Sequence, residues 1–152
     1  MSPQRVFAGS LVAALLATSV ALAEPGVQVA PATSTPPVPA SVRTFLHDAV
    51  QKDVTTDASA AGLNGYTVYP ALLELRRFDD GAKTATLVCI VELTMTKDGG
   101  PVVARVRGNA TSPAATEREL LKVAADAAAA RLSSTLEALN QAQRNGGSVA
   151  RR

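Results

Sequence analysis

The sequence predicts a small two-layer α+β domain, in which a three-stranded antiparallel sheet packs against a long C-terminal helix. Three observations lead to this fold class. An apolar stripe with helical spacing begins near residue 41, and three segments with strand-like alternation follow between residues 66 and 111. A second helical stripe then occupies residues 112–143. The predicted order is therefore α-β-β-β-α, with the strands forming a meander.

The first 23 residues have the features of a secretory signal. Arg5 supplies a positive charge, residues 6–20 form an uncharged apolar run, and residues 21–23 read Ala-Leu-Ala, so we expect cleavage before Glu24. The run is shorter than the roughly 20 residues of a membrane span, so we expect no stable span after cleavage. The protein is thus predicted to be periplasmic or secreted. Retention of the signal as an anchor is the alternative.

Residues 24–40 are rich in proline and alanine and contain no apolar periodicity. Such a composition is typical of a disordered linker. We therefore predict a folded domain over residues 41–143, preceded by this linker and followed by a flexible tail over residues 144–152.

The first predicted helix covers residues 41–53, with Ser41 as its N-cap. Its apolar side chains recur at helical spacing along one face: Val42, Phe45, Leu46, Ala49 and Val50. The sequence then becomes polar and small, and Gly62 and Gly65 indicate a loop before the first strand.

The three predicted strands cover residues 66–78, 84–96 and 102–111. Pro70 cannot donate to a ladder, so the first strand is predicted to lie at an edge of the sheet. Asp79-Asp80-Gly81 and residues 97–100 (Lys-Asp-Gly-Gly) are turn signals that make both connections hairpins.

The hairpin turns also predict which residues pair across the sheet. A three-residue loop at 79–81 would place Leu73 opposite Leu87 and keep one face apolar. In the second hairpin, Glu92 would lie opposite Arg105 or Arg107, depending on which two residues form the loop. Either arrangement gives a cross-strand pair of opposite charge.

The second helix has two candidate starts, Ser112-Pro113 and a capping box formed by Thr116 and Glu119. Residues 124–130 are almost all alanine, so the helix is expected to approach the sheet closely. Its predicted core stripe consists of Leu121, Ala125, Ala128, Leu132, Leu136 and Leu139.

The predicted registers leave an apolar cluster on the sheet face that points away from the long helix. This cluster is flanked by charged residues, an arrangement typical of binding surfaces. The predicted binding residues are Leu72, Val88, Ile90, Arg76, Arg105 and Arg107. The alternative is that the first helix crosses over this face and makes it part of the core.

The sequence lacks any recognisable catalytic or metal-binding motif. His47 is the only histidine and is expected on the surface, and Cys89 is the only cysteine and is expected in the core. We therefore predict no enzymatic activity, no cofactor and no metal. A formal net charge of +2, from 15 Lys and Arg against 13 Asp and Glu, argues against nucleic acid as a partner.

The predicted order of elements over residues 41–143 resembles small α/β domains of bacterial envelope-assembly proteins. Examples are the lipopolysaccharide-assembly lipoprotein and the amino-terminal domain of the TolB family. The chain departs from the lipoprotein group because no cysteine follows the predicted cleavage site. The resemblance implies the fold, and no functional residue is transferred from it.

The leading interpretation is a non-enzymatic binding module of the bacterial cell envelope, which engages an envelope protein or forms a homodimer through its outer sheet face. The alternative is a binder of anionic lipid or glycan that uses Arg76, Arg105 and Arg107.

Overall fold

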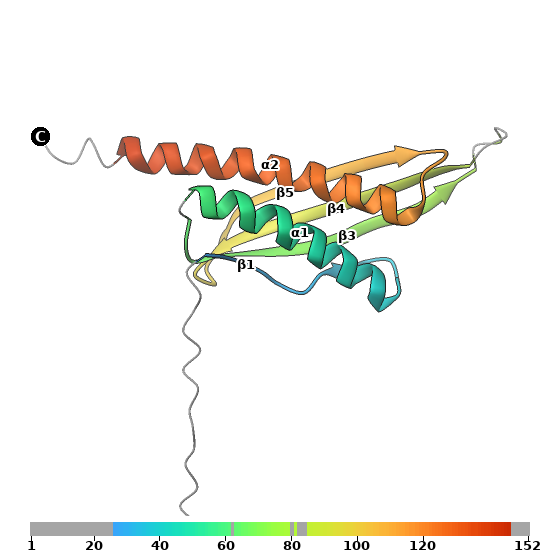
Figure 1. Cartoon of the computed structure of the whole chain (residues 1–152), viewed down its shortest axis with the longest axis horizontal. Coiled ribbons are helices and arrows are strands. Elements are labelled where there is room, and N and C mark those ends of the chain that lie inside the picture. Colours follow the sequence, from blue (N-terminus) through green and yellow to red (C-terminus); the bar gives the residue numbers. More distant parts are fainter. Residues whose placement is uncertain (1–25, 62, 80, 82–84, 147–152) are drawn as a thin grey trace, which may run out of the picture.

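The computed structural model describes residues 26–61, 63–79, 81 and 85–146. Its elements are β1 (Val27–Val29), β2 (Thr33–Ser34), α1 (Ala40–Ala61), β3 (Tyr66–Phe78), β4 (Thr86–Lys97), β5 (Val102–Ser112) and α2 (Glu117–Gly146), as Figure 1 shows. The predicted signal peptide and most of the predicted tail lie outside the described residues.

The predicted α+β class with a long C-terminal helix is confirmed, but the sheet differs in detail. It has five strands rather than three, in the order β1-β3-β4-β5, with β2 also pairing with β3. The pairs β3–β4 and β4–β5 are antiparallel as predicted, whereas β1 and β2 run parallel to β3. The sheet is therefore mixed.

The two additional strands come from the segment predicted to be a disordered linker. The backbone N–H of Ala30 donates to the carbonyl of Val68 at 2.8 Å, and that of Thr35 donates to Leu72 at 3.0 Å. Val27 and Ala32 are buried in the core. The linker prediction is thus wrong for residues 26–35. These residues bond to backbone groups of β3, and the composition of a segment does not indicate whether such a partner strand exists.

Pro70 does not mark an edge strand, which corrects a second prediction. The carbonyls of Val68 and Leu72 face β1 and β2, so the nitrogen of Pro70 between them faces the same side. There the pairing is interrupted, since β1 ends opposite Val68 and β2 begins opposite Ala71. The missing N–H of Pro70 falls in this gap, which allows proline in an internal strand.

A β-bulge at Leu73 changes the predicted register of β3 and β4. The pairing shifts between Leu72 and Glu74, and beyond this point Leu75 lies opposite Cys89. Leu87 pairs with Arg77, not with the predicted Leu73. A bulge inserts one unpaired residue, so even-numbered side chains point to the core before it and odd-numbered ones after it.

The helix α1 is longer than predicted and begins one residue earlier. It starts at Ala40, so Ser41 lies inside the helix, and it continues past Asp53 because Val54 extends the buried stripe. His47 is half-buried and not on the open surface as expected, because its Nδ1–H donates to the carbonyl of Ala30 at 3.0 Å. This bond fastens the segment between β1 and β2 to α1.

The helix α2 begins at the second of its two predicted starts. The Thr116 hydroxyl accepts from the N–H of Glu119 at 3.3 Å, and the Glu119 carboxylate accepts from the N–H of Thr116 at 2.8 Å. This is the predicted capping box. The core stripe is also confirmed, since its first five members are buried and Leu139 packs against them.

Close packing of α2 on β5 depends on small residues on both elements. Gly108 on β5 faces Ala124 and Ala128 on α2, and a Cβ at position 108 would lie 1.9 Å from the Ala124 carbonyl oxygen. The alanine-rich segment thus brings the helix backbone close to the sheet, as the sequence predicted.

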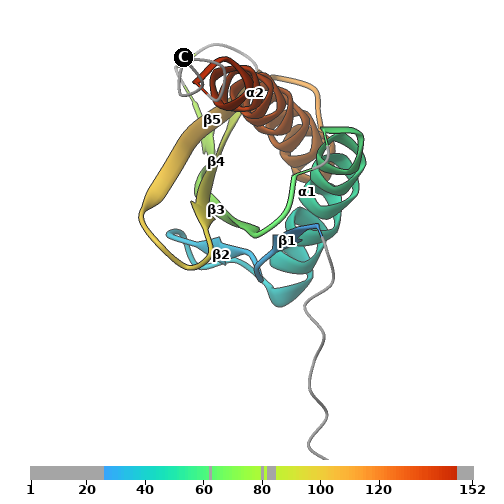
Figure 2. The ribbon, with the colours of Figure 1, turned by 90° about the vertical axis from the view of Figure 1, so that its left-hand side faces the viewer.

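Both helices lie on the same face of the sheet, side by side, so the domain has two layers (Figure 2). Leu46, Val50 and Val54 of α1 and the stripe of α2 fill the space between the layers. We call the helix-covered side of β3, β4 and β5 the inner face and the opposite side the outer face.

An acidic pair lies along the seam between the helices. Burial raises the pKa of Asp53 on α1, and the nearby carboxylate of Asp126 on α2 raises it further. Lys122 donates to Asp126 at 2.7 Å, and Lys122 and Lys52 partly offset these effects. The ionised form of Asp53 is therefore less favourable in the folded chain than in the unfolded one.

Replacing Gly108 by alanine is expected to destabilise the fold by about 1–3 kcal/mol, because the new methyl group would force α2 away from β5. Urea unfolding measures this change. Gly26→Ala is the matched control, since nothing lies within 4 Å of a Cβ at that position. Equal stability of the Gly108→Ala variant and the control would contradict the close approach of α2.

Replacing Asp53 by asparagine is expected to raise the unfolding free energy at pH 7. A carboxyl group with a raised pKa in the folded state destabilises that state once it ionises. The gain should shrink as the pH falls and vanish below the ordinary aspartate pKa of about 3.9, where both states are protonated. Thermal unfolding from pH 3 to pH 8 tests this, with Asp48→Asn on the same helix as control. A gain that does not depend on pH would contradict it.

Candidate interaction surface on the outer sheet face

The outer face is built by alternate residues of three strands whose register places them in rows. Two rows cross its middle: Glu74 on β3, Ile90 on β4 and Asn109 on β5 form one, and Ala71, Glu92 and Arg107 form the next. Val88 lies one row further toward the β3–β4 connection, between Arg76 and Thr111.

The predicted alternative, in which the first helix covers this face, is wrong. α1 packs against α2, β1 and β3 on the inner side, and no described helix lies over the outer side (Figure 2). Val88 and Ile90 are half-buried on that side.

Leu72 is the one predicted binding residue that does not lie on this face. It precedes the bulge at Leu73, points to the inner face and is 1% exposed. Val68 and Pro70 share this orientation and are buried as well. The apolar centre is therefore smaller than predicted, and Leu72 belongs to the core.

Most of the large exposed apolar side chains nevertheless lie on the outer face, toward its two ends. The described residues include five of them, Tyr69, Phe78, Val102, Val103 and Val123. Tyr69 and Phe78 pair with the outer residues Thr94 and Thr86, Val102 pairs with Thr96, and Val103 is the unpaired residue where the β4–β5 register shifts. Tyr69 was not predicted to be a surface residue. It alternates with the buried residues Val68 and Pro70, and this alternation predicts that its side chain is exposed.

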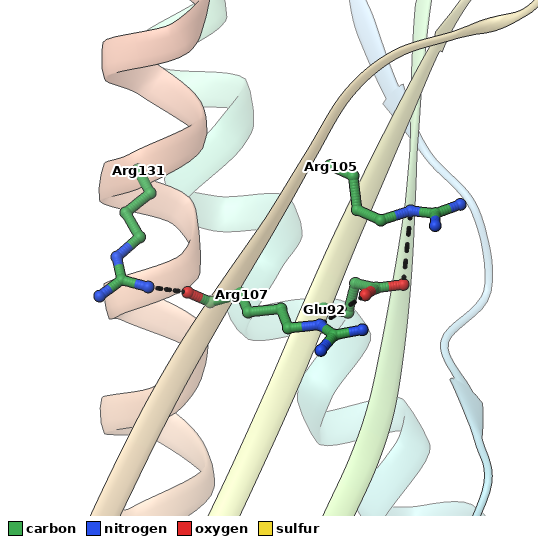
Figure 3. Close-up of polar contacts among 4 residues, drawn as sticks. All are labelled: Glu92, Arg105, Arg107 and Arg131. Atoms are coloured by element: carbon green, nitrogen blue, oxygen red, sulfur yellow. Dashed lines mark hydrogen bonds and ion pairs between the residues drawn. The ribbon is translucent and has the colours of Figure 1, made fainter.

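Glu92 lies between two arginines at the centre of this face (Figure 3). Its carboxylate accepts from Nε of Arg107 at 2.7 Å and lies 3.7 Å from Nε of Arg105. Glu92 and Arg107 are direct cross-strand partners, which is one of the two predicted pairings, although the register shifts between Met95 and Thr96 and places Val102 opposite Thr96 near the turn. On the other side of β5, Arg131 of α2 donates to the carbonyl of Arg107.

Arg76 does not join this pair, so the three predicted arginines do not form one site. It lies on β3 beyond the bulge, opposite Val88, where its guanidinium bonds to Glu74. The same guanidinium stacks on Phe78 with its carbon 3.8 Å from the ring centroid. β4 separates it from Arg105 and Arg107.

The inner side carries a second feature, a cleft of about 470 Å³ where α1 and α2 begin. Phe45, Leu75 and Leu121 form its apolar lining, and the guanidinium of Arg118 lies 4.5 Å from the Phe45 ring centroid. Carboxylates of Asp48 and Glu117 stand beside it, so its charges are mixed.

The remaining titratable groups of the described residues concern metal binding and the single thiol. They contain no group of three or more His, Cys, Asp or Glu side chains that would hold a metal ion. Burial raises the pKa of the Cys89 thiol to about 12, which keeps it protonated and unreactive at neutral pH. Neither described helix is long and apolar enough to cross a membrane.

No protein-family model and no curated protein matches the sequence. Among solved structures, the hypothetical protein CT253 from Chlamydia trachomatis is similar, with a TM-score of 0.56 and 7% identity over 72% of this chain and 96% of that chain. The PelC dodecamer from Paraburkholderia phytofirmans matches with a TM-score of 0.46 and 18% identity, over 65% of this chain and 80% of that one. Lipoprotein GNA1162 from Neisseria meningitidis matches with a TM-score of 0.46 and 10% identity, over 71% and 97%. The first likeness shows a shared fold, and the other two carry no conclusion about this chain.

A double-mutant cycle is expected to give a coupling of about 0.2–1 kcal/mol between Glu92 and Arg107, the range of partly exposed ion pairs. The coupling between Glu92 and Arg105 should be smaller, because that pair is 1 Å longer, at 3.7 Å against 2.7 Å. Urea unfolding of the variants Glu92→Gln, Arg105→Gln and Arg107→Gln, alone and in pairs, measures both values. A larger coupling to Arg105 would contradict the observed geometry.

Proposed function

We propose that this chain is an exported, non-enzymatic interaction module of the bacterial cell envelope. It uses the outer face around Val88 and Ile90 to bind a protein partner or a second copy of itself. The observation that carries the proposal is the placement of both helices on one side, which leaves the opposite face uncovered with most of the exposed large apolar side chains.

Physical chemistry supports an interface on this face. Burying apolar surface favours association by roughly 25 cal/mol per Å². Aromatic residues and arginines are enriched in protein interfaces, and both occur here in Tyr69, Phe78 and the three arginines. The predicted secretory signal supports the compartment.

A ligand such as an anionic lipid or glycan, held by Arg76, Arg105 and Arg107, has less support. Such ligands favour clustered positive charge, whereas Arg76 stands across the sheet from the other two. Each of the three arginines also has a carboxylate partner.

A photoreactive amino acid placed at position 90 in the producing cells is expected to crosslink to another protein chain, because Ile90 lies at the centre of the outer face. Mass spectrometry of the products identifies that chain as an envelope protein or a second copy. Crosslinks confined to the same chain would contradict the proposal.

Replacing Ile90 by lysine is expected to abolish the association detected by this crosslink when the photoreactive group is moved to position 94. The fold should persist, because Ile90 alternates with the buried Cys89 and Val91 and so points away from the helices. Val123→Lys makes the same change at an exposed position on α2 and serves as control. Loss of the crosslink in both variants, or unfolding of Ile90→Lys by circular dichroism, would contradict a specific role of the outer face.

A further inference from the structure

We infer that the partner of the outer face is a protein whose surface presents carboxylate groups around an apolar centre. The inference rests on the proposed function and specifies the chemistry of its partner. It comes from the ion pairs of this face, in which the arginine side chains are more exposed to solvent than the carboxylates that they contact.

The ion pairs on the outer face all have the same orientation. The side chains of Arg105 and Arg107 are 59% and 60% exposed, whereas that of their common partner Glu92 is 13% exposed. Arg76 is 60% exposed and Glu74 is 26% exposed. The carboxylates are recessed and the guanidinium groups stand above them, so the field that an approaching molecule meets is positive.

The geometry also leaves the arginines able to bind further. Glu92 is engaged through Nε of each arginine, and within the described chain no other group bonds to their terminal nitrogens. A guanidinium has five N–H donors, and its paired terminal donors match the two oxygens of a carboxylate. Glu92 therefore holds both side chains in place while their ends remain available.

Three exposed cations stand over two recessed anions, which disfavours a second copy docked face to face. In that arrangement the arginines of both copies would approach one another, and like charges in an interface cost several kcal/mol. A partner with carboxylates is attracted by the same groups.

The spacing of the arginines favours a protein over a membrane. Arg76 lies on β3, two strands or about 10 Å across the sheet from β5, and at least four residues or roughly 13 Å along the strands from Arg107 and Arg105. Val88 and Ile90 lie between them on β4. A protein surface can supply separated carboxylates with apolar side chains between them, whereas a layer of lipid headgroups has no apolar side chains at that level.

The test uses fluorescein-labelled poly-L-glutamate as a carboxylate probe and measures anisotropy with the full folded chain. The parent chain is expected to bind, and the double variant Arg105→Gln/Arg107→Gln should bind about tenfold more weakly. Binding should also weaken as salt rises from about 0.05 to 0.5 M. The double variant Arg43→Gln/Arg118→Gln removes two cations from the helical layer and should bind within about twofold of the parent.

Three outcomes would overturn the inference. The first is an equal loss of poly-L-glutamate affinity in both double variants. The second is binding to phosphatidylglycerol vesicles without binding to poly-L-glutamate. The third is dimerisation of the chain that the substitutions Arg105→Gln/Arg107→Gln strengthen or leave unchanged. Circular dichroism melts of the variants confirm that they fold. If position 90 still crosslinks to another protein in any of these cases, the acidic partner is excluded and the proposed function stands. If that crosslink is absent too, both fail.

Discussion

The bulge at Leu73 is the constraint on which the rest of the sheet depends. Before it, Val68, Pro70 and Leu72 point to the helices, and beyond it Leu75 takes over that direction. The single extra residue reverses the alternation within one strand and so keeps the inner face of β3 apolar as far as Leu75, beyond which the exposed Arg77 takes the inward position. The same reversal puts Glu74 and Arg76 on the outer face.

The composition of the outer face follows from how the other face is covered. α2 approaches β5 closely at Gly108, and α1 fits beside it over β3 and the N-terminal strands. Both helices thereby occupy the inner side, and the outer side retains Tyr69, Phe78 and the arginine–glutamate pairs. A face of this kind is neither a core nor a plain solvated surface, because apolar groups and oriented charges alternate on it.

Much of the site was predictable where the relevant interactions are local or follow a regular period. The pairing of Glu92 with an arginine of β5 was predictable because a short turn joins the two strands, and the register shift between Met95 and Thr96 still leaves Arg107 opposite Glu92. Val88 and Ile90 were placed on the correct face because the alternation along β4 is regular. Leu72 was not, because a bulge leaves no signal in a sequence of mixed apolar residues. The exposure of the arginines over their carboxylates depends on side-chain positions in three strands together.

The sequence by itself determined the class of each long element, the ends of β3, the capping box at Thr116 and the buried stripe of α2. These features arise from periodicity, turn chemistry and helix capping, which act over a few residues. Only the tertiary structure decided that residues 26–35 complete the sheet, that β3 bulges at Leu73 and that both helices share one side. Each of these depends on backbone groups or apolar faces that find their partners far away in the chain, and no local pattern specifies which partner they find.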